Sequence, residues 1–189
     1  MANRLTDDII KAILEAAIFA ASSPLSIDKI QQTVLQDEKI AKKKVKSLLQ
    51  DLQQDYQDRG IELLELASGY RFQAKEALAP WLTHLWSERP TKYSRALLET
   101  LALIAYKQPI TRGEIENVRG VSVSSNIMRT LIERHWIKVV GHKEVPGRPS
   151  LYATTDQFLD YFSLNNLSQL PELMEPESLE LVAKRLESE

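Results

Sequence analysis

Side chains that commonly build catalytic and metal sites are sparse in this chain. It has three histidines, His84, His135 and His142, and no cysteine. Each histidine falls in a different predicted element, and none has a second ligand at the spacing that zinc sites use. His135 directly follows a predicted core helix, where packing or capping is the expected role. The lack of cysteine excludes disulfides, thiol catalysis and cysteine-based zinc sites.

The acidic and glycine residues give no catalytic pattern. Asp7-Asp8 and Asp37-Glu38 are typical of helix starts, where negative charge is stabilising. The sequence has no glycine-rich phosphate loop, no nucleophile elbow and no paired-carboxylate constellation. We therefore expect a protein that is not an enzyme and has no cofactor. An enzyme of an uncharacterised kind is an alternative function, and a buried polar pocket would be its first sign.

Basic residues raise the question of nucleic-acid binding. Four of them gather at the start of one predicted helix: Lys42, Lys43, Lys44 and Lys46. In a DNA-reading helix that part enters the major groove. However, duplex affinity comes mainly from cations that neutralise phosphates. The formal net charge of −2 means that this chain has no overall excess of cations for that purpose. A solvated helix face is the simpler interpretation of the four lysines. Gly147-Arg148-Pro149 matches the core of the minor-groove AT-hook, but a single copy in a predicted hairpin is only weak support for DNA binding.

Helical spacing, caps and breakers predict two similar sets of elements. The first has helices over 6–21, 27–34 and 40–56, strands over 61–67 and 70–74, and a closing helix over 77–86. The second has a helix capped by Thr91, a short helix capped by Thr111, a helix over 122–134, a hairpin turning at Pro146-Gly147, and a helix capped by Thr155. Thr6 and Ser26 are the predicted caps of the first two helices.

The two sets match position by position. Pro24 and Pro109 are 85 residues apart, and at the same offset Leu25-Ser26 correspond to Ile110-Thr111. A hairpin placed after three helices is the wing of a winged helix. The sequence therefore predicts a mainly α fold with small β-hairpins (α+β), built as two tandem winged-helix domains plus a C-terminal tail. The expected domains are 1–88 and 91–164, and 165–189 is an acidic, partly flexible tail.

The tail has two possible interpretations. Leu179, Val182, Ala183 and Leu186 lie at helical spacing with acidic residues between them. The first interpretation is a frayed chain end, which is the common fate of termini. The second is an amphipathic segment that docks on a partner.

The first residues of the sequence do not have the pattern of a signal peptide, because acidic residues lie where a signal peptide has basic ones. The apolar residues 12–21 are too few to span a bilayer. We therefore expect a cytoplasmic protein with no membrane contact.

One stretch resembles a known family. It runs from Leu101 to Arg112, continues with Glu114-Ile115 and Arg119-Gly120-Val121, and resumes with Gly147-Arg148-Pro149, Leu151 to Thr155, Phe158-Leu159 and Leu170-Pro171. These residues resemble the segregation and condensation protein B (ScpB) family, accessory subunits of the bacterial SMC–kleisin complex. Ala153 stands where the family usually has glycine. The strong match covers roughly residues 95–173, and the first unit matches mainly in layout.

The resemblance implies a non-catalytic subunit. It implies two winged-helix domains, a homodimer paired largely through the N-terminal units, and binding of the kleisin ScpA. The SMC ATPase would be reached through ScpA, and DNA only indirectly or weakly. The complex condenses and segregates the bacterial chromosome, so the protein is expected to be nucleoid-associated. The alternative from the residues alone is a winged-helix DNA-binding transcriptional regulator.

Two groups of residues are candidate interaction sites. The candidates for kleisin binding are Tyr106, Arg112, Arg148, Tyr152 and Phe162. The candidates for the dimer interface are Trp81, Leu82, Leu85 and Trp86. For Tyr152 and Phe162 core packing is an equal possibility, and Arg148 could serve only to stabilise its turn. The closing helix that carries the tryptophans could belong to the core, to an interface or to both.

Overall fold

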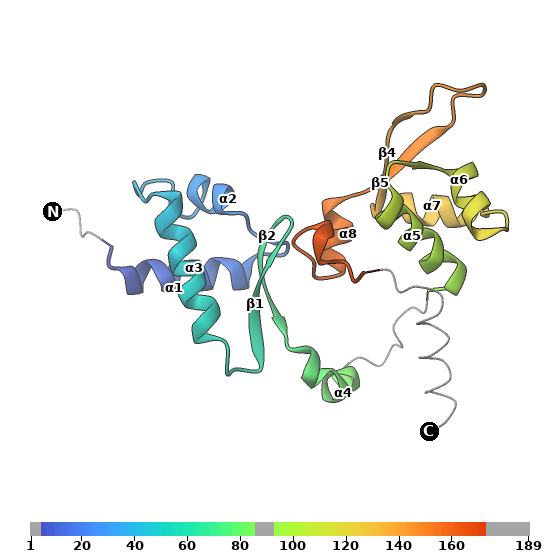
Figure 1. The fold of residues 1–189 in the computed structure, drawn as a ribbon. Helices are drawn as coiled ribbons and strands as arrows, with labels where there is room; N and C mark the ends of the chain where they lie inside the picture. Colours follow the sequence, from blue (N-terminus) through green and yellow to red (C-terminus); the bar gives the residue numbers. More distant parts are fainter. Residues whose placement is uncertain (1–4, 86–92, 173–189) are drawn as a thin grey trace.

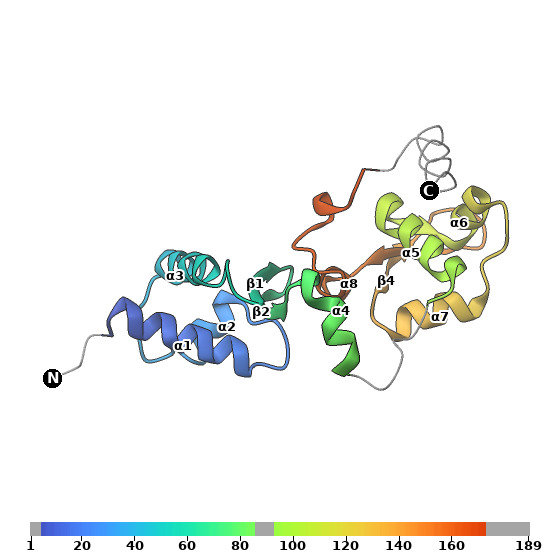
Figure 2. The ribbon, with the colours of Figure 1, turned by 90° about the horizontal axis from the view of Figure 1, so that it is seen from below.

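The computed structural model describes residues 5–85 and 93–172 of the 189-residue chain. The elements form two groups that lie side by side along an elongated molecule (Figures 1 and 2). Each group consists of three helices, an antiparallel hairpin and a closing helical segment. The expected fold class, mainly α with small hairpins and a repeated winged-helix unit, is confirmed.

The first unit begins with the helices α1 (Asp7–Ala20), α2 (Ile27–Gln32) and α3 (Lys42–Asp55). The hydroxyls of Thr6 and Ser26 accept hydrogen bonds from backbone N–H groups three residues further on, as the sequence predicted. These bonds satisfy donors that have no partner inside a helix. Apolar side chains at helical spacing then turn into a common core: Ile10, Leu14, Ile18, Ile30, Val45, Leu48, Leu49 and Leu52.

The hairpin of the first unit consists of β1 (Ile61–Leu66) and β2 (Gly69–Ala74). Its two-residue turn is Ala67-Ser68, one residue earlier than the sequence predicted. Gly69 has φ of 140°, and a Cβ atom there would lie 2.4 Å from the backbone of Leu25. Only glycine therefore allows the strand to approach the residues before α2, where Leu25 and Tyr70 exchange backbone hydrogen bonds of 2.9 and 3.0 Å.

The closing segment of the first unit is broken into three short pieces. They are the 3-10 helix η1 (Glu76–Leu78), α4 (Ala79–Leu82) and the 3-10 helix η2 (Thr83–Leu85). The predicted single helix over 77–86 is wrong in this respect. Pro80 has no N–H and its ring would clash with the carbonyl four residues earlier, so it is accepted only in the first turn of a new helix.

The second unit begins with α5 (Arg95–Lys107), α6 (Arg112–Arg119) and α7 (Ser125–Glu133). Ser94 caps α5, one turn later than the predicted cap Thr91, which lies outside the described residues. Thr111 and Glu114 form a reciprocal capping box at α6, and Gly120 ends that helix with φ of 68°. Glycine suits this left-handed position because it has no side chain to crowd the backbone.

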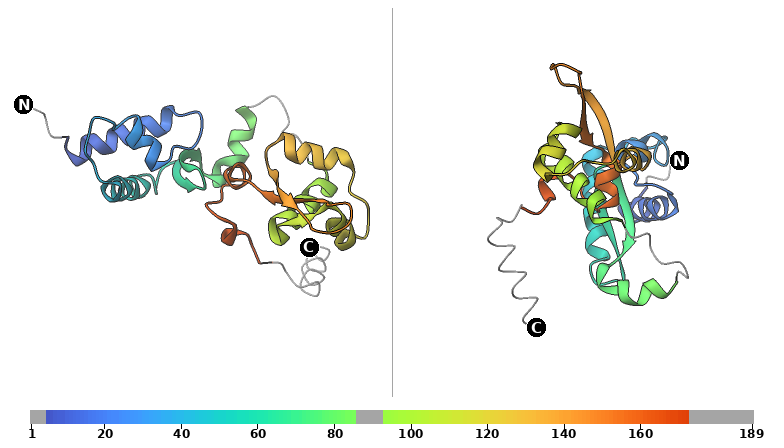
Figure 3. Two further views of the ribbon diagram at one scale, coloured as in Figure 1. Left: turned by 90° about the horizontal axis from the view of Figure 1, so that it is seen from above. Right: turned by 90° about the vertical axis from the view of Figure 1, so that its right-hand side faces the viewer.

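Three strands form the sheet of the second unit, in the order β3-β5-β4. They are β3 (Ile110–Thr111), β4 (Ile137–His142) and β5 (Ser150–Thr154). The predicted turn is present, with Gly147 at φ of 85°. The wing made by β4 and β5 and the helix α4 lie on opposite sides of the molecule (Figures 1 and 3).

The closing helix of the second unit is α8 (Asp156–Tyr161), which the Thr155 hydroxyl caps as predicted. A 3-10 helix, η3 (Leu167–Gln169), follows it. Phe158 and Leu159 enter a second core, separate from the first, whose other members include Leu101, Ile104, Ile115, Val123, Leu131, Trp136 and Ile137. Among the described residues, no helix has the length and apolar character needed to cross a membrane.

The two units touch where the hairpin turn of the first meets the end of α8 (Figures 1 and 2). The Ala67 N–H donates to the Leu164 carbonyl at 3.2 Å. The Ser68 N–H donates to a carboxylate oxygen of Asp160 at 3.1 Å. Arg71 donates to the Asp160 carbonyl at 3.4 Å. The junction thus consists of a few polar contacts around one turn, together with Ala67, which packs against the second core.

Candidate partner-binding surfaces

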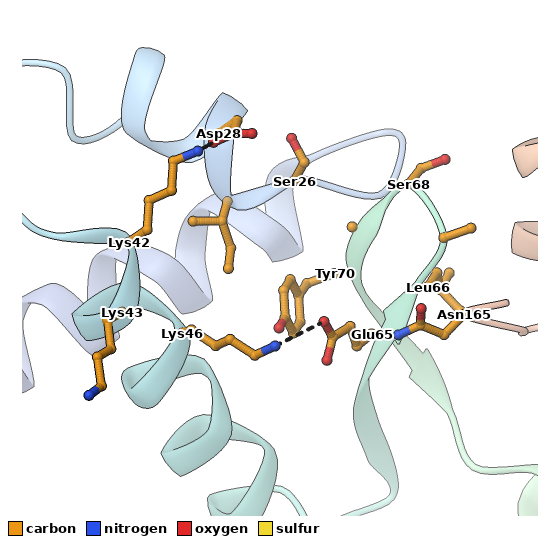
Figure 4. A pocket seen from close by; sticks show the side chains of 13 residues that line it. Ser26, Asp28, Lys42, Lys43, Lys46, Glu65, Leu66, Ser68, Tyr70 and Asn165 are labelled. Atoms are coloured by element: carbon orange, nitrogen blue, oxygen red, sulfur yellow. Dashed lines mark ion pairs between the residues drawn. The ribbon is translucent and has the colours of Figure 1, made fainter.

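The predicted lysine cluster lies beside an open pocket at the junction (Figure 4). The pocket has a volume of about 570 Å³ and is lined by the starts of α2 and α3, by the β1–β2 hairpin and by Asn165. Lys46 Nζ lies 3.9 Å from a carboxylate oxygen of Glu65, and Lys42 forms an ion pair with Asp28 (Figure 4).

Acidic partners neutralise most of this cluster. Besides the two pairs in the pocket, Lys44 forms an ion pair with Asp7. Within the part of the chain that the structure describes, only Lys43 of the four has no ion pair, and it points away from the others (Figure 4). A neutralised cluster contributes little to phosphate binding, because that affinity comes from cations that replace counterions on the backbone.

Tyr70 also lines the pocket. Its hydroxyl is buried and has no hydrogen-bond partner among the described residues. Burial, with the negative charge of Glu65 in addition, raises the pKa of Tyr70. The phenol therefore stays protonated at every physiological pH. It presents one neutral donor to the pocket, which is an orienting group and not a catalytic acid or base.

The closing segment of the first unit exposes large apolar side chains. Trp81 is 69% exposed and Leu85 is 71% exposed, and Leu82 is half-buried. Trp86, the fourth predicted interface residue, lies outside the described residues. Side chains of this size in adjacent helical turns form an apolar patch of the kind that marks a protein–protein contact.

A groove runs between α5 and α8 in the second unit. We call it the α5–α8 groove, and its volume is about 340 Å³. Its lining is apolar: Leu98, Leu101, Ala102, Ala105, Tyr106, Phe158, Phe162, Leu164, Leu170 and Pro171. The Tyr106 hydroxyl donates a hydrogen bond of 2.6 Å to the Pro171 carbonyl. The chain after α8 therefore forms one wall of the groove.

A second groove lies on the other side of Tyr106, between α5 and α6. This α5–α6 groove has a volume of about 390 Å³, and its lining residues are Glu99, Ala102, Leu103, Tyr106, Lys107, Val118, Arg119 and Val121. Arg119 donates to Glu99 at 3.0 Å. Hydrogen bonds from Arg95 and then from Arg119 lower the pKa of Glu99, so this carboxylate stays charged.

Aromatic rings join the start of α5, the end of α7 and α8 into one cluster. The ring centroids of Trp136 and Tyr161 are 4.7 Å apart, and those of Trp136 and Phe162 are 5.6 Å apart. The Arg134 guanidinium lies 4.8 Å from the Tyr93 ring centroid, within reach of a cation–π attraction. The sequence did not predict this cluster. Only the density of aromatics over 152–162 was a signal.

The five residues predicted to bind a partner do not converge on one place. Tyr106 and Phe162 both line the α5–α8 groove. Arg112 instead holds α6 to the next loop: it donates to Glu116 at 3.0 Å, to Ser125 at 3.2 Å and to the Val123 carbonyl. Its guanidinium is therefore engaged inside the unit.

The other two predicted residues belong to the wing. Arg148 stands at its tip with φ of 37° and donates to Glu144 at 3.0 Å, with 71% of its side chain exposed. Tyr152 lies in the central strand β5, opposite Ile110 of β3, and packs against the second core. The structure does not bring Arg148 or Tyr152 to either groove.

The wing is tied to α6 by one acidic residue. Lys143 and Glu114 form a hydrogen-bonded ion pair of 2.5 Å. Glu114 also accepts from the Thr111 N–H and hydroxyl, both at 2.8 Å. Lys143 first, and then these two bonds, lower the pKa of Glu114 to about 2. The carboxylate therefore remains charged and links the two elements at neutral pH.

Metal-site geometry is not found in residues 5–85 and 93–172, where no three histidine, aspartate or glutamate side chains gather. His135 has a left-handed backbone with φ of 55°, and its carbonyl accepts a hydrogen bond from the Thr155 hydroxyl. At this place it forms the turn between α7 and β4, and its part is structural.

The chain is similar to proteins of one known family. A family model described as segregation and condensation complex subunit ScpB matches residues 12–173. The chain belongs to the ScpB family. A relative from Coxiella burnetii, named segregation and condensation protein B homolog, is 52% identical over 172 residues, which are 91% of this chain and 82% of the relative.

Two solved ScpB structures are also similar. ScpB from Mycobacterium tuberculosis is 33% identical with a TM-score of 0.40, and covers 85% of this chain and 98% of its own. A dimer of an ScpB N-terminal domain complexed with an ScpA peptide is 37% identical with a TM-score of 0.36, and covers 40% of this chain and 93% of its own. Both TM-scores are low, so membership of the ScpB family rests on the sequence matches.

Proposed function

We propose that this ScpB-family chain is a non-catalytic accessory subunit that homodimerises and binds the kleisin ScpA in an SMC complex for chromosome condensation and segregation. The observation that carries the proposal is the separation of two apolar surfaces. The exposed closing segment lies on the first unit, and the α5–α8 groove lies on the second. Each surface lacks catalytic groups and has the character of a protein contact.

The first unit, residues 1–88, is the proposed dimerisation domain. Trp81 and Leu85 leave most of their surface in water, and Leu82 lies between them. Burying a large apolar side chain stabilises a complex by roughly 1.5–3 kcal/mol relative to leaving it exposed. Two copies of the patch across a two-fold axis would cover both at once, because a two-fold interface pairs the same surface with itself. Trp86 is proposed to extend the patch.

The second unit, residues 91–164, is the proposed kleisin-binding domain. The α5–α8 groove is apolar, with the Tyr106 ring at its edge, and an apolar groove of this kind can accept the apolar face of an amphipathic segment. Tyr106 and Phe162 would contact the kleisin directly. Arg112 and Tyr152 would act by holding α6 and the sheet in place, and Arg148 offers an exposed cation at the wing tip.

ATP hydrolysis would then belong to the SMC partner, and DNA would be contacted only indirectly or weakly. Support comes from the three ion pairs that neutralise the α3 lysines. The alternative of a DNA-binding regulator needs a cationic recognition helix, and no observation favours it. The proposed place of action is the cytoplasm, at the nucleoid.

The test of kleisin binding uses purified ScpA and the full chain. Tyr106→Ala with Phe162→Ala is expected to weaken capture of ScpA at least tenfold, because both substitutions remove aromatic side chains that line the same groove. Ile132→Ala is the matched control, since Ile132 is an exposed apolar residue of the same unit that lines neither groove. Circular dichroism checks that each variant folds. Unchanged capture by the folded double variant would reject the groove as the site.

The test of dimerisation is sedimentation without ScpA. Trp81→Ser with Leu85→Ser is expected to give monomers at concentrations where the unaltered chain and Ile132→Ala are dimers. The exposed positions of both side chains make a folding defect in the monomer unexpected. A dimer of unchanged affinity in the double variant would move the interface elsewhere.

A further inference from the structure

The described part of the second unit ends beside the α5–α6 groove. The Tyr106 hydroxyl holds the Pro171 carbonyl at 2.6 Å, and Tyr106 itself lines both grooves. The chain therefore leaves the α5–α8 groove beside Tyr106, which lies on the border between the two grooves. Seventeen residues, 173–189, follow from this point.

The α5–α6 groove has the features of a site that is incomplete. Val118 is 52% exposed and Val121 is 56% exposed, although both line a concave surface. The Arg119 side chain is only 10% exposed, and its Nε–H has no hydrogen-bond partner among the described residues. A buried donor without an acceptor costs free energy. An occupant that fits this groove would therefore have an oxygen that accepts from the Arg119 Nε–H and apolar side chains that cover the two valines.

The last seventeen residues have the matching chemistry. Leu179, Val182, Ala183 and Leu186 recur at the spacing of one helix face. Five glutamates against Lys184 and Arg185 give this segment a formal charge of −3. The lining of the groove has two cations, Lys107 and Arg119, and one acid, Glu99, so its formal charge is positive.

We propose that residues 173–189 dock in the α5–α6 groove of their own chain. The apolar side of the segment would cover Leu103, Val118 and Val121, and a glutamate would accept from the Arg119 Nε–H. The seven residues from Glu172 to Leu179 span up to ~25 Å, which is ample for a groove that starts at Tyr106. The tether also gives a local concentration in the millimolar range, so weak contacts suffice.

This inference does not rest on the proposed function. It leaves the α5–α8 groove as the surface open to a partner and assigns the neighbouring groove to the chain itself. A second copy of the chain, or a segment of another protein, would be the alternative occupant of the α5–α6 groove. The experiment separates these outcomes.

Cysteine cross-linking tests the docking in the full chain, which has no native cysteine. Val118→Cys places a thiol at an exposed position that lines the α5–α6 groove and not the α5–α8 groove, and Val182→Cys places one on the apolar side of the segment. An intramolecular disulfide is expected to form at least tenfold faster than in the matched pair of Val118→Cys with Arg185→Cys, whose second thiol lies on the charged side. Equal rates, or a product that is a covalent dimer, would overturn docking in the same chain.

Hydrogen exchange gives a second readout without any cross-link. Leu179→Ser with Leu186→Ser is expected to speed amide exchange severalfold in α6 and in the C-terminal half of α5, because the groove loses its cover. Exchange in α1 and α3, which belong to the other core, is expected to stay the same. Unchanged exchange over residues 102–121 would contradict the proposal.

Discussion

The two units differ most in what their closing segments cover. In the second unit α8 places Phe158 at 3% exposure and Leu159 at 9% in its own core. In the first unit the corresponding segment leaves Trp81 and Leu85 about 70% exposed. The same architecture is therefore self-sufficient in one copy and incomplete in the other. The copy that does not bury its closing segment is the one proposed to dimerise.

The hairpins differ in a related way. Each returning strand pairs with the residue two positions before the second helix: Tyr70 with Leu25 in the first unit, and Tyr152 with Ile110 in the second. Leu25 and Ile110 are 85 residues apart, the offset of the repeat. The first hairpin, however, uses its turn to hold the second unit, whereas the wing of the second projects away (Figure 1). One copy supplies the junction and the other supplies free surface.

The largest expected effect is the loss of a closing side chain from a core. Phe158→Ala should lower the free energy of unfolding of the second unit by roughly 3–5 kcal/mol, because it removes a buried ring and leaves a cavity. Leu85→Ala should change the first unit by less than about 0.5 kcal/mol in dilute solution, where its side chain is already in water. Denaturant unfolding followed by circular dichroism measures both. Similar losses would remove the contrast between the closing segments.

A smaller effect distinguishes two glycines with positive φ. Gly69→Ala should cost on the order of 3 kcal/mol, because its Cβ would lie 2.4 Å from the backbone of Leu25 in addition to the strained φ. Gly120→Ala should cost only about 1–2 kcal/mol, since nothing lies within 4 Å and the left-handed backbone is the whole penalty. Thermal unfolding of both variants measures this difference. A Gly69→Ala variant as stable as Gly120→Ala would mean that the first hairpin is less closely packed on Leu25.

The two units should also differ in how their stability responds to acid, because of Glu114 in the second unit. The pKa of Glu114 is lowered to about 2 in the folded chain by Lys143 and Thr111. The carboxylate therefore contributes stability that is fully present above about pH 4.5 and declines as the pH falls towards about 2. The equivalent position of α2 in the first unit is Lys29, so the first unit has no carboxylate at this place.

Glu114→Gln sharpens this comparison. It should lower the stability of the second unit at pH 7 and flatten its dependence between about pH 4.5 and pH 2, while the first unit is unaffected. Urea unfolding of the variant and the unaltered chain at a series of pH values, followed by circular dichroism, provides the measurement. A pH dependence that persists unchanged in the variant would assign it to other carboxylates.

The smallest effect is expected at the lysines of α3. Lys42→Gln, Lys44→Gln and Lys46→Gln together should change the free energy of unfolding by about 1 kcal/mol or less, because exposed ion pairs contribute little. Binding of a short DNA duplex should be weak before the change and little altered by it. A large, salt-dependent loss of duplex binding would instead support the DNA-binding alternative.

Local sequence signals predicted most of the elements but not all of their bounds. The caps at Thr6, Ser26, Thr111 and Thr155 lie where hydroxyl residues precede an apolar period, and all four are confirmed. β3 was missed because two residues carry no period. Around Pro80 the helical period was present, but the ring forced a new start of the helix.

The candidate site could be predicted only in part. Tyr106 and Phe162 were both named from the sequence, and they meet in one groove although 56 positions separate them. Arg112 was named with them, but its guanidinium is occupied by Glu116, Ser125 and the Val123 carbonyl. A side chain's residue type does not reveal its partners, since these come from loops that the fold brings near.

The order of the amino acids by itself determined the helices, the hairpins and their repetition, because hydrogen bonding at caps, turn chemistry and apolar periods act over a few neighbouring residues. Only the tertiary structure decided which closing segment is buried, which cations are neutralised and where the two grooves lie. Those properties depend on contacts between positions far apart in the chain, such as Tyr106 with Pro171 and Ser68 with Asp160. They exist only once both cores have packed.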